Sequence, residues 1–331
     1  MRTEYHLGGN YMNDALETIK DIRYVKLKFK VVMTEDTVLT KNKGSALRGG
    51  MGEMLLRANC IRDRDCEKCD FEKECIVQRT MYSKMDKRPS FMSEGDSVGY
   101  VLECYDHREQ FVAGDELSFN LILFGKSIVY LSQYLNAFYA LGRSGLGRNK
   151  SKFEVVEVQN SVGLPILDGT NVYMERYKVE TLGNYINYRR KKLLENGNIS
   201  GDDCGSFSIR FNNPLTVKYH GNFIKEFSVD AVVKALIRRL YILQCFEEIE
   251  SDLIDWYPKT LPVMKDEEHY DVSIKRHSNR KKSDIVLKGI EGKMTIEKVS
   301  PVLLNLLLAG EITHIGKNTS FGFGGYIIST N

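Results

Sequence analysis

The first half of the chain alternates between strand-like and helix-like hydrophobic patterns. Arg23–Met33 alternates basic and apolar side chains, which is typical of a strand with one buried face. Residues 45–59 and 126–141 have helical spacing, and the second range carries an apolar stripe that ends before Gly142. Further strand-like runs lie at 98–105, 117–123 and 152–158. The order strand, helix, strand, strand, helix, strand is that of a ferredoxin-like domain.

The second half repeats this order more loosely, after a linker-like stretch at 160–169 that contains glycine and proline. Helices are expected at 228–248 and 301–309, and strands at 206–211, 215–219, 272–277, 285–296 and 326–329. The pattern of residues 173–204 is ambiguous. A chain of 331 residues is long enough for two domains. We therefore expect an α+β protein with tandem ferredoxin-like domains at 1–160 and 170–331.

Composition and charge change this picture only locally. Hydrophobic residues make up 42% of the chain and charged residues 27%, which is ordinary for a globular protein. No apolar run is long enough for a membrane span and residues 1–10 lack a secretory pattern, so we expect a prokaryotic cytoplasmic protein without a membrane partner. The net charge is +3, but residues 271–298 alone hold eight basic and four acidic side chains, and 141–153 holds four basic and no acidic ones. Clustered basic stretches favour a polyanion site over a merely solvated face when they occur together.

Four of the seven cysteines form a compact group with the spacing C-x5-C-x2-C-x5-C. A central C-x2-C lets two thiolates share one tetrahedral ion, so the group predicts a structural zinc site, with an iron–sulfur cluster or metal-free cysteines as alternatives. Four thiolates would leave no open coordination position for catalysis. The expected ligands are Cys60, Cys66, Cys69 and Cys75.

Three further motifs combine glycine or basic residues in ways that suit RNA. The first, LGRSGLGR at 141–148, places Arg143 and Arg148 around Gly145 and Gly147, although a plain connector would have the same composition. The second, RHSNRKK at 276–282, offers guanidinium groups for phosphates. The third follows His314 and interleaves aromatic rings with donors and glycines, which suits RNA backbone and unstacked bases. Its expected contact residues are Gly316, Lys317, Thr319, Gly322 and Gly324.

Taken in order, these motifs resemble one family, the CRISPR precursor-RNA-processing endoribonucleases of the RAMP superfamily, in a branch with a four-cysteine insertion. The resemblance covers about residues 23–329. It rests on LRGG at 47–50, the cysteine group, LFGK at 123–126, the loop at 141–148, Phe211 with Pro214-Leu215, RHSNR at 276–280 and HIGKNTSFGFG at 314–324. The last motif is the most specific.

The resemblance implies a two-domain RRM-like RAMP fold and cleavage of a CRISPR repeat transcript without a catalytic metal. The ribose 2′-OH would attack the adjacent phosphate, leaving a 2′,3′-cyclic phosphate and a 5′-OH. Many members have a catalytic histidine near the first helix, where this chain offers Lys41, Lys43 and Arg48 instead. The candidates for catalysis are therefore His314, His277, Lys41 and Lys43, and those for RNA contact in the basic motifs are Arg48, Arg143, Arg148, Arg276, Arg280 and Lys281.

A second interpretation is a non-catalytic RAMP subunit that binds guide RNA in an effector complex together with other CRISPR-associated proteins. The missing histidine favours this interpretation, whereas the cysteine group and the C-terminal motif favour the endoribonuclease. A zinc-dependent enzyme is a poor third, because all four thiolates would saturate the ion.

Overall fold

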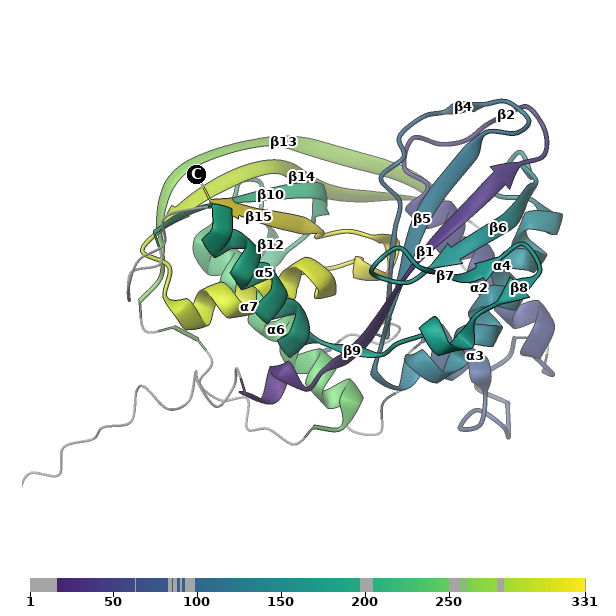
Figure 1. The fold of residues 1–331 in the computed structure, drawn as a ribbon, viewed down its shortest axis with the longest axis horizontal. Helices are drawn as coiled ribbons and strands as arrows, with labels where there is room; N and C mark the ends of the chain where they lie inside the picture. The colour runs from purple at the N-terminus through teal and green to yellow at the C-terminus, as the bar shows by residue number, and fades with distance from the viewer. Residues whose placement is uncertain are drawn as a thin grey trace, which may run out of the picture.

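The computed structural model describes residues 17–62, 64–82, 99–196, 205–249, 260–278 and 283–330, with positions 85, 88–89, 91–92 and 257–258 between them. Two antiparallel sheets, each with helices on one side, make up this part of the chain (Figure 1). No helix within it is both long and apolar enough to cross a bilayer.

The N-terminal sheet has the ferredoxin-like strand order. Its path β3-β5-β1-β6 contains β1 (Arg23–Met33), β3 (Tyr100–Glu103), β5 (Glu116–Phe124) and β6 (Phe153–Gln159). The helices that connect these strands are α2 (Gly44–Asn59) and α4 (Leu131–Ser144). The 3-10 helix η1 (Gly125–Tyr130) comes directly before α4. The sheet extends past β6 through β7 (Pro165–Asp168) and β8 (Asn171–Val172), and β9 (Glu180–Thr181) pairs with β1. The first sheet thus takes in strands as far as residue 181. Short accessory elements are α3 (Ile76–Thr80), η2 (Met174–Arg176) and the pair β2 (Thr37–Val38) with β4 (Gln110–Phe111).

The C-terminal sheet has the same order, β13-β14-β10-β15, so the expectation of tandem ferredoxin-like domains is confirmed. Its strands are β10 (Ser206–Leu215), β13 (Val263–Ser278), β14 (Ser283–Glu297) and β15 (Tyr326–Thr330). Helices α6 (Val229–Glu247) and α7 (Pro301–Thr313) connect them, and α5 (Leu182–Asn196) packs against α7. The remaining short elements are β11 (Lys218–Tyr219), β12 (Asn222–Phe223) and η3 (Thr319–Phe321).

Local sequence explains where the main C-terminal helices begin. Ser228 and Ser300 precede α6 and α7, and their side chains accept hydrogen bonds from the amides of Ala231 and Leu303. Such N-caps contribute about 0.5–2 kcal/mol each. Pro301 occupies the first turn of α7, where its missing N–H leaves no hydrogen bond broken.

The end of β5 in the N-terminal sheet is buried on both faces, because its side chains alternate between two apolar cores. Leu121 and Leu123 join the core beneath α2 and α4. Ile122 and Phe124 point to the opposite face and join the core that contains Leu236 of α6. The two domains therefore share apolar packing, which fixes their relative position.

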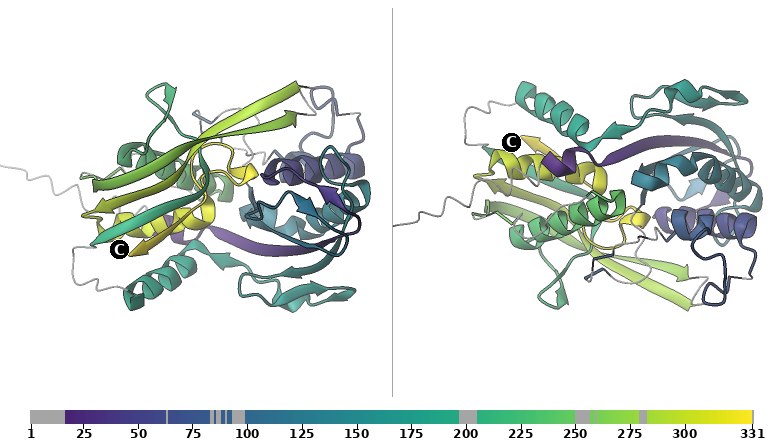
Figure 2. Two further views of the ribbon diagram at one scale, coloured as in Figure 1. Left: turned by 90° about the horizontal axis from the view of Figure 1, so that it is seen from above. Right: turned by 90° about the horizontal axis from the view of Figure 1, so that it is seen from below.

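A long hairpin also joins the domains. Strands β13 and β14 reach from the C-terminal sheet toward the N-terminal domain, where β13 approaches α2 (Figures 1 and 2). Near the end of this hairpin, Asp284 forms an ion pair with Arg148 at 2.9 Å. Two of the basic motifs identified in the sequence therefore lie side by side.

Candidate nucleic-acid interface

The glycine-rich loop after α7 is held in shape by its own backbone. His314, Gly316, Asn318, Gly322 and Gly324 have positive φ angles, which explains the glycines at three of these positions. The amide of Gly324 donates to the carbonyl of Pro214 at 2.9 Å, and the amide of Lys317 donates to Thr216 at 2.8 Å. These amides are therefore used inside the protein. Of the expected contact residues here, Lys317 is exposed and Gly316 half-buried, whereas Thr319, Gly322 and Gly324 are buried.

The same loop is clamped against the first domain. A Cβ atom on Gly44, the first residue of α2, would lie 2.5 Å from the carbonyl oxygen of Phe321. A Cβ atom on Gly322 would lie 2.7 Å from the carbonyl oxygen of Leu102 in β3. Only glycine permits these approaches, so the loop meets the N-terminus of α2 at the junction of the domains.

Two arginines meet the Phe321 ring at this junction. The guanidinium carbon of Arg48, one turn into α2, lies 5.0 Å from the ring centroid, and that of Arg276 on β13 lies 4.7 Å from it. Arg48 also donates to the Tyr100 hydroxyl at 3.1 Å. Three segments that are far apart in the sequence thus place two cations on one aromatic ring.

The electrostatics of Arg276 favour a bound anion. Burial lowers the pKa of its guanidinium, and the nearby positive charge of Arg48 lowers it further. Its Nε is buried and has no hydrogen-bond partner among the described residues. An anion placed between the two guanidinium groups would relieve both the repulsion and the unmade hydrogen bond.

The basic loop that follows α4 continues this surface. Arg143, Gly147 and Arg148 are exposed, whereas Gly145 is buried, with φ of 88° and a carbonyl group of Lys150 where its Cβ would be. The Arg148–Asp284 ion pair brings the loop beside the β13–β14 hairpin. Arg280 and Lys281, which are expected at the hairpin turn, lie outside the described residues, as does the side chain of His277.

His314 is completely buried between the domains. Its Nε2 lies 2.7 Å from the Glu103 carboxylate on β3, and its Nδ1 lies 3.0 Å from the Phe323 carbonyl oxygen. Both partners are acceptors, so each ring nitrogen donates when both bonds are made. This geometry gives His314 a structural position and disfavours the expected catalytic role, since no ribose could reach a ring with both nitrogens engaged.

Glu103 collects further cationic and donor partners. Lys26 Nζ lies 3.1 Å from its carboxylate, and Asn120 donates to it at 2.8 Å. Burial alone would raise the pKa of Glu103, but Lys26, His314 and Asn120 outweigh burial and hold the pKa well below its usual range. Glu103 was not expected from the sequence, because its key contact joins residues 211 positions apart.

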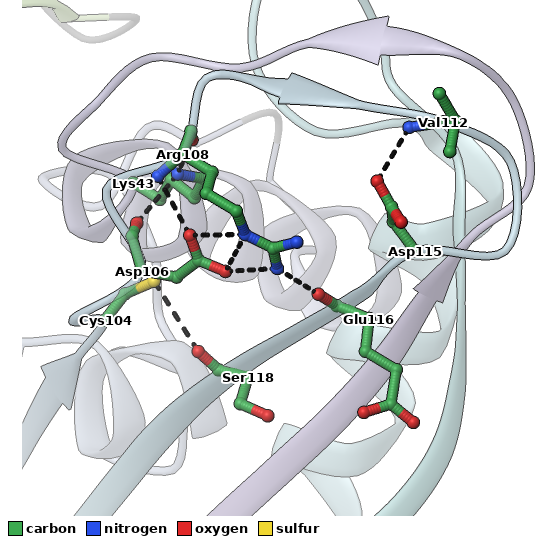
Figure 3. A network of polar contacts seen from close by, with 8 residues as sticks. All are labelled: Lys43, Cys104, Asp106, Arg108, Val112, Asp115, Glu116 and Ser118. Atoms are coloured by element: carbon green, nitrogen blue, oxygen red, sulfur yellow. Dashed lines mark hydrogen bonds and ion pairs between the residues drawn. The ribbon is translucent and has the colours of Figure 1, made fainter.

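Lys43 also has a structural position (Figure 3). Its ammonium group is buried and donates to the carbonyl oxygens of Asp106 and Arg108 at 2.8 and 2.5 Å. Burial is the main cause that lowers the pKa of Lys43. Arg108 in turn forms an ion pair with Asp106 at 2.6 Å and donates to the Glu116 carbonyl oxygen. Lys43 therefore anchors the loop after β3, whereas Lys41 is exposed at the entrance to α2.

The four cysteines line one pocket of about 250 Å³ between the end of α2, the loop that follows it and α3. With the side chains in their present orientations, no group of three Cys, His, Asp or Glu residues in the described part of the chain is close enough together to hold a metal ion. The donor chemistry of four thiols fits zinc, and Cys60, Cys66, Cys69 and Cys75 line the same pocket.

Two family models match parts of the chain. Residues 22–181 match a family model described only as an N-terminal domain, and residues 209–326 match the model of the CRISPR-associated endoribonuclease Cas6. No curated protein matches the chain.

Solved structures support the same fold. A partial Cas6-RT-Cas1–Cas2 complex has a TM-score of 0.55 at 10% identity, with 94% of this chain and 47% of that chain covered. A Cas6 product complex has a TM-score of 0.51 at 11% identity, with 92% and 99% covered. The chain thus spans about half the length of the first of these proteins and nearly all of the second. At such identities the likeness concerns the fold, and the four-cysteine branch stays a prediction.

Two ferredoxin-like sheets, a glycine-rich loop clamped at their junction and a family match over the second sheet lead to one conclusion: this chain has the fold of the Cas6 structures to which it is similar, and its residues 209–326 match the family model of the CRISPR-associated endoribonuclease Cas6.

Proposed function

We propose that this protein binds CRISPR repeat RNA at the domain junction and cleaves it without a catalytic metal. The observation that carries the proposal is the convergence of Arg48 and Arg276 on Phe321, with Arg276 partly buried and its Nε unpaired in the described structure. Two guanidinium groups suit a phosphate, and an aromatic ring beside them suits an unstacked base. Exposed Arg143 and Arg148 extend the basic surface along the RNA backbone.

The chemistry requires charge stabilisation at one phosphate. When the ribose 2′-oxygen bonds to the neighbouring phosphorus, negative charge grows on the non-bridging oxygens until the bond to the 5′-oxygen breaks. Arg48 and Arg276 would stabilise this charge in the partly buried site, where electrostatic interactions are stronger than in water. The products would be a 2′,3′-cyclic phosphate and a 5′-OH.

A non-catalytic guide-RNA-binding subunit is the second candidate. It is favoured by the positions of His314 and Lys43, because both are buried and engaged by protein acceptors. In either case, other CRISPR-associated proteins are proposed partners, since one similar structure is a Cas6-RT-Cas1–Cas2 complex. We place the activity in the prokaryotic cytoplasm, where repeat transcripts are made.

Incubation of the purified protein with labelled repeat RNA in EDTA tests the proposal. We expect one cut per repeat, with 2′,3′-cyclic phosphate and 5′-OH ends identified by mass spectrometry. A 2′-deoxy nucleotide at the cut site should stop cleavage and spare binding, because the nucleophile is removed. Equal cleavage of the deoxy substrate would disprove the mechanism, and tight binding without any cleavage would favour the second candidate.

We also propose that Cys60, Cys66, Cys69 and Cys75 bind one structural zinc ion. The support is their spacing together with their position around one pocket. A closed set of four thiolates would stabilise the segment between α2 and α3 and take no part in RNA cleavage.

A further inference from the structure

The loop after β3 is anchored more firmly than an ordinary surface connection. Lys43 donates to the carbonyl oxygens of Asp106 and Arg108, the two residues on either side of His107 (Figure 3). The side chains of Asp106 and Arg108 are joined to each other by an ion pair. A buried ammonium group is expensive to desolvate, so its use here indicates a loop whose position matters. His107 is the residue that this anchoring holds in place.

A hydrogen bond sets the orientation of the His107 ring. Its Nδ1 lies 3.4 Å from the carbonyl oxygen of Lys41, which can only accept a hydrogen bond. Nδ1 is therefore the protonated nitrogen of the neutral ring, and Nε2 keeps its lone pair. Because His107 is exposed, this lone pair is accessible from solvent. The ring is thus prepared to accept a proton.

The ring lies at the same end of α2 as the arginine pair. Lys41, its hydrogen-bond partner, is three residues before Gly44, whose backbone touches the Phe321 carbonyl group. Arg48 follows one helical turn after Gly44 and contacts the Phe321 ring. The His107 loop and the arginine pair therefore both contact the N-terminal end of α2.

We propose that His107 is the general base of the cleavage reaction, an inference that rests on the proposed function. Its Nε2 takes the proton of the ribose 2′-OH while the bond from the 2′-oxygen to phosphorus forms. The bond between phosphorus and the 5′-oxygen breaks, and the 5′-oxygen takes a proton from water. The hydroxide so formed then takes the proton from His107, and the ring returns to its starting state.

The other histidines whose side chains the structure describes are less suited to this role. His314 is buried with both nitrogens engaged, and His269 pairs with the Glu267 carboxylate at 2.9 Å. His220 is exposed, but it lies on the β11–β12 turn in the C-terminal domain. His107 combines exposure, an Nδ1 contact with the Lys41 carbonyl oxygen and a position at the same end of α2 as the arginine pair.

Two substitutions at His107 separate a catalytic role from a structural one. His107→Ala removes the ring, whereas His107→Asn keeps a donor for the Lys41 carbonyl oxygen and removes the basic nitrogen. Both should lower the single-turnover rate on repeat RNA by about 10²–10⁴-fold, the usual range for loss of an acid or base, with an unchanged RNA Kd. Added imidazole should restore part of the rate in His107→Ala. The matched control is His220→Ala, which should cut at the wild-type rate.

Wild-type cleavage by either folded His107 variant, or restoration by His107→Asn alone, would overturn the inference and leave the proposed function intact. Failure of the wild-type protein to cut any repeat RNA would overturn both. Circular dichroism of each variant confirms that the measured rates belong to folded protein.

Discussion

Glu103 and Arg276 are charged side chains at the same junction in opposite electrostatic situations. Glu103 is buried among a lysine, a histidine and an asparagine that all favour its ionised form. Arg276 is partly buried beside another arginine, and both its burial and the charge of Arg48 disfavour its charged form. The first arrangement is complete within the protein, whereas a bound anion would complete the second.

Replacing Arg276 with glutamine should weaken RNA binding and its salt dependence together. Each phosphate contact on a single strand contributes a slope of about −0.7 to the dependence of log K on log salt. Fluorescence anisotropy measures RNA binding between low and physiological salt. The slope of log K against log salt should be less steep for Arg276→Gln than for the wild type by about that amount. The control is Lys191→Gln, an exposed cation on α5. An unchanged slope in folded Arg276→Gln would place the RNA elsewhere.

Replacing Glu103 with glutamine should destabilise the protein at neutral pH, by about 3–5 kcal/mol, because it removes a buried carboxylate from its contacts with Lys26 and His314. The low pKa of Glu103 also predicts a pH effect. Its contribution to the free energy of unfolding is complete above the unfolded-state pKa of about 4.3 and is lost as the pH falls from there toward the folded-state pKa.

Urea unfolding at pH 7, 4 and 3 measures this contribution. The difference in the free energy of unfolding between the wild type and Glu103→Gln should become smaller as the pH falls. The control is Glu109→Gln, an exposed position on the loop after β3, whose free energy of unfolding should stay close to that of the wild type. A gap that is constant across this range would contradict the ionised state assigned to Glu103.

At the scale of elements, most helices and strands follow from their hydrophobic period, and the exceptions have identifiable causes. The pattern predicted a strand from residue 272, but β13 begins at Val263, because pairing with β14 extends it through charged positions. Two strands were expected around Pro214, where β10 is one strand with a register shift between Phe211 and Leu215. Proline lacks the amide for a ladder bond, so a bulge is the natural solution.

Helix α5 shows why the hydrophobic period of a helix can be missed in the sequence. Its inner face contains Leu182, Ile186 and Leu193, but also Arg189, which is buried in an ion pair with Glu311 at 2.6 Å. A charged residue on the buried face hides the amphipathic pattern from the sequence. The linker expected at 160–169 likewise contains β7, which pairs with β6 at the sheet edge.

The cysteine segment provides an element-scale prediction. If the four thiolates hold zinc, elemental analysis of protein purified without chelator should give about one zinc ion per chain. Cys66→Ser should lower the zinc content and the melting temperature, because structural metal binding is coupled to folding. Cys245→Ser on α6, outside the pocket, is the control and should keep the metal. Zinc-free wild-type protein would contradict the site.

The site was only partly predictable because its parts meet across the domain junction. The motifs pointed to Arg48, Arg276 and the loop that contains Phe321, since their residue types suit RNA in any arrangement. The sequence could not reveal that His314 is buried against Glu103, or that Lys43 anchors the residues around His107. These contacts depend on how two domains pack, and no local spacing encodes that packing.

At the scale of the whole molecule, the shared core predicts cooperative unfolding. Ile122 and Phe124 of the N-terminal sheet pack in the same core as α6 and α7. Hydrogen exchange followed by mass spectrometry in increasing urea should therefore give coincident midpoints for the two sheets. Ile122→Ala should lower the urea midpoints of both sheets. The shift should correspond to a loss of about 2–5 kcal/mol in the free energy of unfolding.

The control for this experiment is Val162→Ala, an exposed position between β6 and β7. Two separate transitions in the wild-type protein, or a shift confined to the N-terminal sheet in Ile122→Ala, would show that the domains unfold independently.

The double burial of the end of β5 also bears on which substitutions the chain tolerates. In a sheet with one solvated face, every second residue of a strand is free to become polar. Residues 121–124 of β5 are all fully buried, two in each core. A library that varies this strand should therefore show four consecutive intolerant positions in place of the usual alternation. Sequence variation in this protein should therefore concentrate at exposed positions, while residues 121–124 of β5 change little.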